Sequence, residues 1–219
     1  AAPTYAGDDT AAARARLVEI VKSHVRETAG MLGQEELDPR VVAALGTVPR
    51  HEFVPSDQRR HAYADRPLPI GHGQTISQPY IVAIMTDLVD AGPGDRVLEI
   101  GTGSGCQSAI FSELSNFVFT IEIVEPLAVR AETLLDSLGY DNVVVRTGDG
   151  YLGWPDAAPF DVILVTAAPP HIPAVLIDQL AYGGRMIIPV GVSFQRLQVI
   201  TKEKQGLRTE DIAGVRFVP

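Results

Sequence analysis

The second half of the chain alternates between short continuous apolar runs and longer stretches in which apolar residues recur every three or four positions. The runs predict strands at 96–100, 117–124, 143–147, 161–167 and 185–190. The first of them has the pattern of a strand buried on both faces. The stretches between them predict helices at 106–115, 127–138 and 174–180. This alternation predicts an α/β fold with a doubly wound, mostly parallel sheet.

The two ends of the chain follow other patterns. After a loose arm at 1–9, helical spacing predicts a helix from Thr10 to Gly30. A second helix is predicted from Asp38 to Leu45, since Asp38 is a suitable N-cap and a proline follows it. Two late segments, 197–202 and 212–218, have no helical pattern between them and predict antiparallel strands added to the sheet.

The stretch from Ala62 to Pro79 has little helical or strand period. Long irregular loops inside compact domains are usually functional or disordered. Its aromatic and apolar residues favour a functional loop, and the alternative is a structural lid without chemistry. Ser77 is a candidate N-cap for a helix that continues to Val89.

Three alternating glycines follow the strand at 96–100: Gly101, Gly103 and Gly105. Such glycines let the backbone turn sharply and approach a ligand, and the next helix would direct its free N–H groups at that ligand. The dinucleotide fingerprint requires a further glycine where this chain has Cys106. The acidic form of the pattern, with Glu99 inside the strand, is that of S-adenosylmethionine (SAM) methyltransferases. A nicotinamide or flavin site, or a tight turn without a ligand, remains the alternative.

Ligands of open α/β sheets bind outside the carboxyl ends of the strands, and polar or small residues occupy those ends here. Glu122 is placed to accept hydrogen bonds from ribose hydroxyls, unless it is a solvated surface acid. Asp149, between Gly148 and Gly150, is placed to accept from an adenine amino group. The small residues of 166–170 leave room for a methyl donor and a nucleophile. Both of these last segments could equally be ordinary turns.

The sequence offers no obvious general base, because its five histidines are scattered and show no metal-ligand spacing. A substrate that is already anionic, such as a carboxylate, needs no base. Methyl transfer to it requires alignment of the two groups and exclusion of water. Ser77 is the best candidate to orient a carboxylate oxygen, and this role could coexist with that of N-cap.

Composition narrows the classes of partner and compartment. The net charge of −9 argues against electrostatic binding to nucleic acid or to an anionic membrane. No apolar run approaches the ~18 residues of a membrane helix. With Cys106 as the single cysteine, neither an internal disulfide nor a cysteine metal cluster is expected. A cytoplasmic protein is predicted, or a periplasmic or secreted one if the Ala-Ala-Pro start follows a removed signal peptide.

Seven segments together resemble the protein-L-isoaspartate (D-aspartate) O-methyltransferase family. They are PRHEFVP (49–55), AYADRPLPIGHGQTISQPYIVA (62–83), RVLEIGTGSG (96–105), GDG (148–150), APFDVILVTAAPP (158–170), GGRMIIPVG (183–191) and VRFVP (215–219). The resemblance spans about 36–219 and implies a SAM-dependent enzyme that methylates the free carboxylate of L-isoaspartyl, and also D-aspartyl, residues in damaged proteins. The methyl ester then re-forms a succinimide, and repeated cycles restore normal aspartate.

We expect a single methyltransferase domain over 1–219, with a helical extension at 1–60, an active-site loop at 61–80 and a Rossmann-like core at 81–219. The partners that the resemblance implies are isoaspartyl proteins and peptides. We also expect a monomer without a metal. The serine of the TIS motif, Ser77, matches the catalytic residue. Positions that match the cofactor site are Gln74, Thr75, Ile76, Ser77, Gln78, Glu99, Gly101, Thr102, Gly103, Ser104, Glu122, Gly148, Asp149, Gly150 and Thr166. Positions assigned to the substrate site are Ser77, Ala167, Ala168, Val215 and Arg216.

The chain departs from the family pattern at two positions and in its first thirty residues. Cys106 stands where an aromatic residue often follows the last loop glycine, and Ser108 stands where threonine is common. Three rival functions remain: a nicotinamide-dependent oxidoreductase, a SAM-binding module that recognises isoaspartyl proteins without turnover, and a methyltransferase for another carboxylate or a small molecule.

Overall fold

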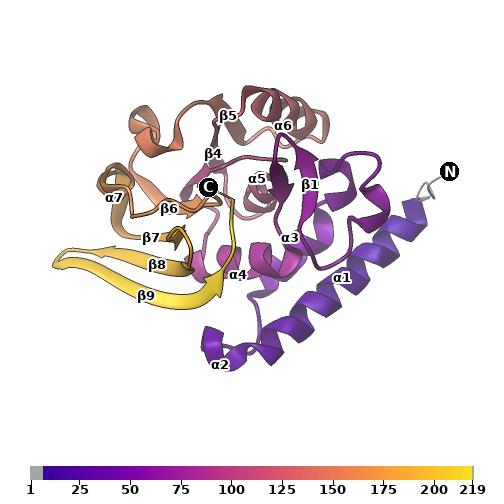
Figure 1. Cartoon of the computed structure of the whole chain (residues 1–219), viewed down its shortest axis with the longest axis horizontal. Coiled ribbons are helices and arrows are strands. Elements are labelled where there is room, and N and C mark those ends of the chain that lie inside the picture. Colours follow the sequence, from indigo (N-terminus) through magenta and orange to yellow (C-terminus); the bar gives the residue numbers. More distant parts are fainter. Residues whose placement is uncertain (1–6, 219) are drawn as a thin grey trace.

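A seven-stranded sheet forms the centre of the molecule in the computed structural model, which describes residues 7–218 (Figure 1). The strand order is β5-β4-β3-β6-β7-β8-β9. Strands β3 to β7 are parallel, whereas β8 and β9 are antiparallel additions at one edge. The bounds are β3 Arg96–Ile100, β4 Phe117–Glu122, β5 Val143–Thr147, β6 Phe160–Val165, β7 Leu180–Val190, β8 Gln195–Glu203 and β9 Gly206–Val215. The predicted fold class is confirmed.

Both faces of the central strands are buried, which explains their continuous apolar runs. Val97 faces a core beneath α4 Pro79–Val89, α5 Cys106–Ser112 and α6 Glu125–Ser137. Its neighbour Leu98 faces a second core under α7 Ala174–Gln179. Both side chains are fully buried. Two single-turn 3₁₀ helices, Gly150–Leu152 and Pro155–Ala157, lie between β5 and β6 in the chain.

The N-terminal helices complete the first core. Their bounds are α1 Gly7–Glu27, α2 Ala29–Leu32 and α3 Pro39–Thr47. The helix predicted to run to Gly30 ends at Glu27 instead, and α2 ends where Gly33 takes a φ of 75°. The Asp38 carboxylate accepts a hydrogen bond from the Arg40 N–H, which confirms the predicted N-cap. Helix α1 packs against α3 and α4 on the outside of this layer (Figure 1).

The prediction of an irregular loop over 62–79 was wrong in its second half. Strands β1 Leu68–Gly71 and β2 Gln74–Ile76 form an antiparallel hairpin. The turn takes left-handed conformations, with φ of 93°, 52° and 73° at Gly71, His72 and Gly73. The strands are too short for a period to show, and a proline interrupts the first. Two single-turn 3₁₀ helices, Arg50–Phe53 and Arg59–His61, precede the hairpin.

The last strand also differs from its prediction. β9 begins at Gly206 and ends at Val215, rather than covering 212–218. Its first half is polar and exposed because it lies at the edge of the sheet, so hydrophobicity does not mark it. Pro219 and the Ala1-Ala2-Pro3 start lie outside the described residues. Within 7–218, no helix is both long enough and apolar enough to cross a membrane.

Candidate active site

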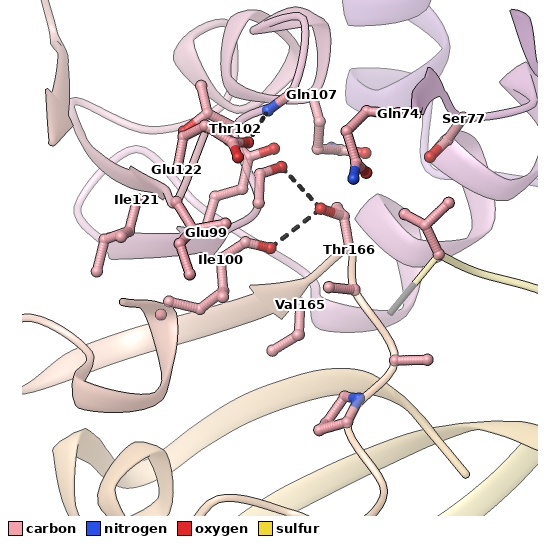
Figure 2. Close-up of a pocket in the computed structure, with 18 of the residues that line it drawn as sticks. Gln74, Ser77, Glu99, Ile100, Thr102, Gln107, Ile121, Glu122, Val165 and Thr166 are labelled. Carbon is pink, nitrogen blue, oxygen red and sulfur yellow. Dashed lines mark hydrogen bonds between the residues drawn. The ribbon is translucent and has the colours of Figure 1, made fainter. Parts of the chain in front are cut away.

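A cavity of about 300 Å³ opens at the carboxyl ends of β3, β4 and β6. Its lining includes the β2 strand with Ser77, the glycine loop after β3, the end of β4, and the segments after β5 and β6. In Figure 2, Gln74 and Ser77 lie across the cavity from Ile121 and Glu122. Residues far apart in the sequence therefore meet at the edge where open α/β sheets bind ligands.

The glycine loop requires backbone conformations that disfavour other residues. Gly101, Gly103 and Gly105 have φ of 95°, 53° and 86°. A Cβ on Gly101 would collide with the hydroxyl of Thr166. That hydroxyl donates a hydrogen bond shared between the carbonyls of Ile100, at 3.0 Å, and Gly101, at 2.7 Å (Figure 2). The loop is thus held close to β6 and leaves backbone lining the cavity.

Glu122 fixes the other side of the loop. One carboxylate oxygen accepts from the Gly103 N–H at 2.7 Å, and the other accepts from the Val124 N–H at 2.9 Å. The residue is only 5% exposed, yet it lines the cavity. Each oxygen has a second lone pair, so the carboxylate can still accept from a ligand hydroxyl. The surface-acid alternative is therefore wrong.

Glu99 is a fully buried carboxyl group against the cavity. One of its oxygens accepts from the hydroxyls of Ser108 and Thr120, the latter at 2.8 Å. The other oxygen, Oε1, is buried without a hydrogen-bond partner in the described residues. Burial raises the pKa of Glu99 to about 8, although the two hydroxyl hydrogen bonds oppose the shift. A ligand in the cavity could satisfy Oε1 with an acceptor while the group is protonated, or with a donor or cation once it is ionised.

Ser77 is not the N-cap of α4, because that position belongs to Gln78. Its carbonyl accepts from the Arg50 guanidinium at 2.7 Å. Arg50 also donates to the Ala62 carbonyl, at 2.9 Å, and is buried. The Ser77 side chain lines the cavity, with no hydrogen bond to another side chain or carbonyl in the described residues, so its hydroxyl is available to a ligand.

Arg50 was not among the predicted site residues. Burial lowers the pKa of its guanidinium, and the nearby Cys106 and Asp65 oppose the shift. No local pattern distinguishes Arg50 from the polar His51 and Glu52 that follow it, because its role depends on a contact 27 positions along the chain.

The remaining strand ends supply polar and small groups. An Asp149 carboxylate oxygen accepts from the Tyr151 N–H at 2.9 Å, which leaves the other oxygen free to face a ligand. A Cβ on Gly150 would collide with the side chain of Ile100, so only glycine lets the backbone approach Ile100 this closely. Thr166 and the four residues that follow it also line the cavity.

Most predicted site residues line the cavity: Gln74, Thr75, Ile76, Ser77, Glu99, Gly101, Thr102, Gly103, Ser104, Glu122, Asp149, Gly150, Thr166, Ala167 and Ala168. Four others lie outside its lining: Gln78, Gly148, Val215 and Arg216. The Gln78 amide donates to Asp65, the Gly148 N–H donates to the Glu122 carbonyl, Val215 pairs with Gln195 in the sheet, and Arg216 is exposed. Lining residues missed in the sequence include Val82, Gln107, Ile123, Tyr151, Pro173, Leu176 and Val218. These are mostly apolar, and no pattern distinguishes them from core residues.

Comparison with known proteins places the chain in a family. The family model described as "Protein-L-isoaspartate(D-aspartate) O-methyltransferase (PCMT)" matches residues 28–219. A Polaromonas protein named protein-L-isoaspartate O-methyltransferase 2 is 57% identical, over 93% of this chain and 98% of its own. A Syntrophobacter fumaroxidans protein of the same name is 56% identical, over 98% of this chain and 88% of its own.

Two solved structures share the fold closely. A protein-L-isoaspartate O-methyltransferase is 29% identical with a TM-score of 0.83, over 94% of this chain and 65% of its own. A Plasmodium falciparum protein described as a putative protein-L-isoaspartate O-methyltransferase, in complex with S-adenosyl-L-homocysteine, is 27% identical with a TM-score of 0.78, over 93% and 95% of the two chains. The chain belongs to the protein-L-isoaspartate (D-aspartate) O-methyltransferase family.

Proposed function

We propose that the chain transfers a methyl group from SAM to the free carboxylate of L-isoaspartyl residues, and of D-aspartyl residues, in damaged proteins and peptides. The observation that carries the proposal is the cavity itself. It brings the hydroxyl of Ser77 to the same site as the glycine loop and the Glu122 carboxylate. One wall thus suits a carboxylate, and the opposite wall suits a nucleoside with a ribose diol.

The residues of the cavity fit the cofactor. Gly101 and Gly103 adopt left-handed conformations and line the cavity with backbone, and Glu99 Oε1 lies against it without a hydrogen-bond partner in the described residues. When bound, SAM supplies a methyl group on a sulfonium sulfur, which a carboxylate oxygen displaces to form a methyl ester and S-adenosyl-L-homocysteine. Glu122 would accept from the ribose hydroxyls, and Asp149 would accept from the adenine amino group.

The chain's own residues need only orient the substrate and exclude water. The Ser77 hydroxyl would donate to one carboxylate oxygen and direct the other toward the methyl group. Ala167 and Ala168 border the cavity with small side chains and leave room for the incoming group. No proton has to be removed from a carboxylate, so the reaction does not require a general base. Gln78, Val215 and Arg216 remain proposed contacts of the cofactor or substrate.

Isoaspartyl proteins are the proposed partners, without nucleic acid, because a net charge of −9 opposes binding to a polyphosphate. We also propose a cytoplasmic monomer. The compartment and the oligomeric state are proposed from the sequence.

The test uses labelled SAM and two peptides that differ only in isoaspartyl or ordinary aspartyl at one position. Label on the isoaspartyl peptide alone is the expected result. Label on both would retain the methyltransferase and reject the repair function. Label on neither, with SAM still bound, would favour the non-catalytic module.

Ser77→Ala tests the assigned role of the hydroxyl. A hydrogen bond to a charged group contributes about 1.5–3 kcal/mol, so the loss predicts a roughly ten- to hundred-fold lower kcat. SAM affinity should change less than about two-fold. Ser137→Ala is the matched control, because that serine is exposed on α6 and, among the described residues, its hydroxyl donates only to the Leu134 carbonyl of the same helix. Wild-type turnover in Ser77→Ala would reject the role.

A further inference from the structure

His24, in the last turn of α1, contacts Asp65 and Tyr80, which lie near the cavity-lining Ser77. This helix lies before the start of the family match at residue 28. The ring Nδ1 of His24 lies 3.1 Å from a carboxylate oxygen of Asp65, whose side chain is only 10% exposed. A carboxylate accepts, so the ring nitrogen is the donor.

Asp65 in turn holds the two residues on either side of Pro79. One of its oxygens accepts from the Tyr80 N–H at 2.9 Å, and the other accepts from the Gln78 side-chain amide at 3.2 Å. Helix α4 has no side-chain hydrogen bond from its own N-cap residue, Gln78. Asp65 therefore caps α4 from a distance, satisfying an N–H group of its first turn. Ser77 lies directly before this capped turn.

Two further contacts join α1 to the same turn. The rings of His24 and Tyr80 stack with centroids 3.8 Å apart and an interplanar angle of 19°. The Thr28 hydroxyl, just after α1, hydrogen-bonds the Tyr80 hydroxyl at 2.8 Å. His24 thus contacts both Asp65, which caps α4, and Tyr80, which lies in the first turn of α4.

We propose that His24 and Asp65 are positioning residues for Ser77, and that α1 is thereby part of the active-site scaffold. The inference rests on the proposed function, since it assigns a consequence for methyl transfer. The His24 ring limits where the Asp65 carboxylate can lie. The carboxylate fixes the start of α4 and hence the place of the Ser77 hydroxyl. Arg50 holds Ser77 from the other side, through its carbonyl.

Two substitutions at His24 separate the hydrogen bond from the ring stacking. His24→Phe keeps a ring against Tyr80 and removes the donor to Asp65. His24→Asn places an amide donor near the Nδ1 position and removes the ring. Glu19→Ala is the control, because Glu19 is exposed on the same helix and pairs only with Lys22 in the described residues.

The first measurement is the rate of methyl ester formation on the isoaspartyl peptide at saturating SAM. A misplacement near 1 Å can cost up to about a hundred-fold, and we expect kcat of His24→Phe to fall about ten-fold. SAM affinity should stay within about two-fold, and His24→Asn should recover most of the loss. Glu19→Ala should behave as the wild type. Wild-type kcat in His24→Phe would overturn the inference, as would an equal loss in His24→Asn.

The second measurement is amide hydrogen exchange, which does not depend on turnover. Peptides covering 74–80 should exchange about ten-fold faster in His24→Phe, and those from β3 should not change. If the wild type forms no ester while this local increase appears, the proposed function fails and the scaffold role stands. If the wild type is active and exchange at 74–80 is unchanged in His24→Phe, the scaffold role fails alone.

Discussion

Replacing Gly101 by alanine tests whether the glycine loop depends on both its backbone conformation and its contact with Thr166. At a φ of 95°, alanine would be strained, at a cost of about 1–3 kcal/mol. The new Cβ would also occupy the place of the Thr166 hydroxyl. Threonine must then rotate and lose its hydrogen bond to the Ile100 and Gly101 carbonyls, which costs about 1 kcal/mol.

These values give an expected double-mutant cycle. Gly101→Ala should lower the free energy of unfolding by roughly 2–4 kcal/mol, and Thr166→Ala should lower it by about 1 kcal/mol. In the double variant the hydrogen bond is already lost and the collision is relieved. The loss of unfolding free energy in the double variant should therefore not exceed that of Gly101→Ala alone. Additive effects would make it about 1 kcal/mol larger, so we expect a coupling energy of about 1 kcal/mol or more.

Urea unfolding followed by circular dichroism measures all four proteins of the cycle. Gly139→Ala is the matched control, because Gly139 has a φ of 81° but open space where its Cβ would lie. It should show the backbone strain alone, at about 1–3 kcal/mol. SAM affinity should fall in Gly101→Ala and remain unchanged in Gly139→Ala. Additive effects at Gly101 and Thr166, or equal losses at the two glycines, would refute the reasoning.

Two further predictions concern the buried ionisable groups Arg50 and Glu99. Arg50→Lys should lower both kcat and stability, the latter by about 1–3 kcal/mol, because one ammonium cannot replace a guanidinium that donates to both the Ala62 and Ser77 carbonyls. Initial rates and urea unfolding test it against Arg59→Lys, an exposed ion-pair control, and wild-type values in Arg50→Lys would contradict it. For Glu99, the folded pKa of about 8 exceeds the ordinary value of 4.5, so its stability contribution is complete below 4.5 and is lost as pH rises to about 8. Unfolding of the cofactor-free protein at pH 5, 6.5 and 8 should show a steeper decline in the wild type than in Glu99→Gln, and parallel profiles would contradict this.

The strands of the sheet could be predicted closely because their environment leaves a local signal. β3 and β5 begin and end at the predicted residues, 96–100 and 143–147, because each carries an apolar run bounded by turns. In β3 the run is buried, whereas β5 lies at an edge of the sheet and keeps its run of valines although it is partly exposed. β9 was misplaced because its exposed first half is polar and carries no apolar run. The β1–β2 hairpin was missed because its strands are too short to establish a period.

The site could be predicted on its cofactor side more completely than on its substrate side. Glycines, Glu99 and Glu122 have positions set by the ends of strands, so strand order alone brings them together. The surroundings of Ser77 depend on contacts that no local pattern contains. The cap of α4 comes from Asp65, and the partner of the Ser77 carbonyl comes from Arg50. The N-cap expected at Ser77 was wrong for the same reason.

This asymmetry suits the proposed reaction. The cofactor wall is built from backbone groups and buried carboxylates on the rigid edge of the sheet. On the substrate wall the proposed role belongs to the Ser77 hydroxyl, which has no hydrogen-bonded base among the described residues and acts through its position alone. Its contribution therefore depends on how firmly the segment around it is held. The structure holds that segment by Arg50 on one side and by Asp65 with His24 on the other. Variants in these three residues should reduce turnover more than they reduce cofactor binding.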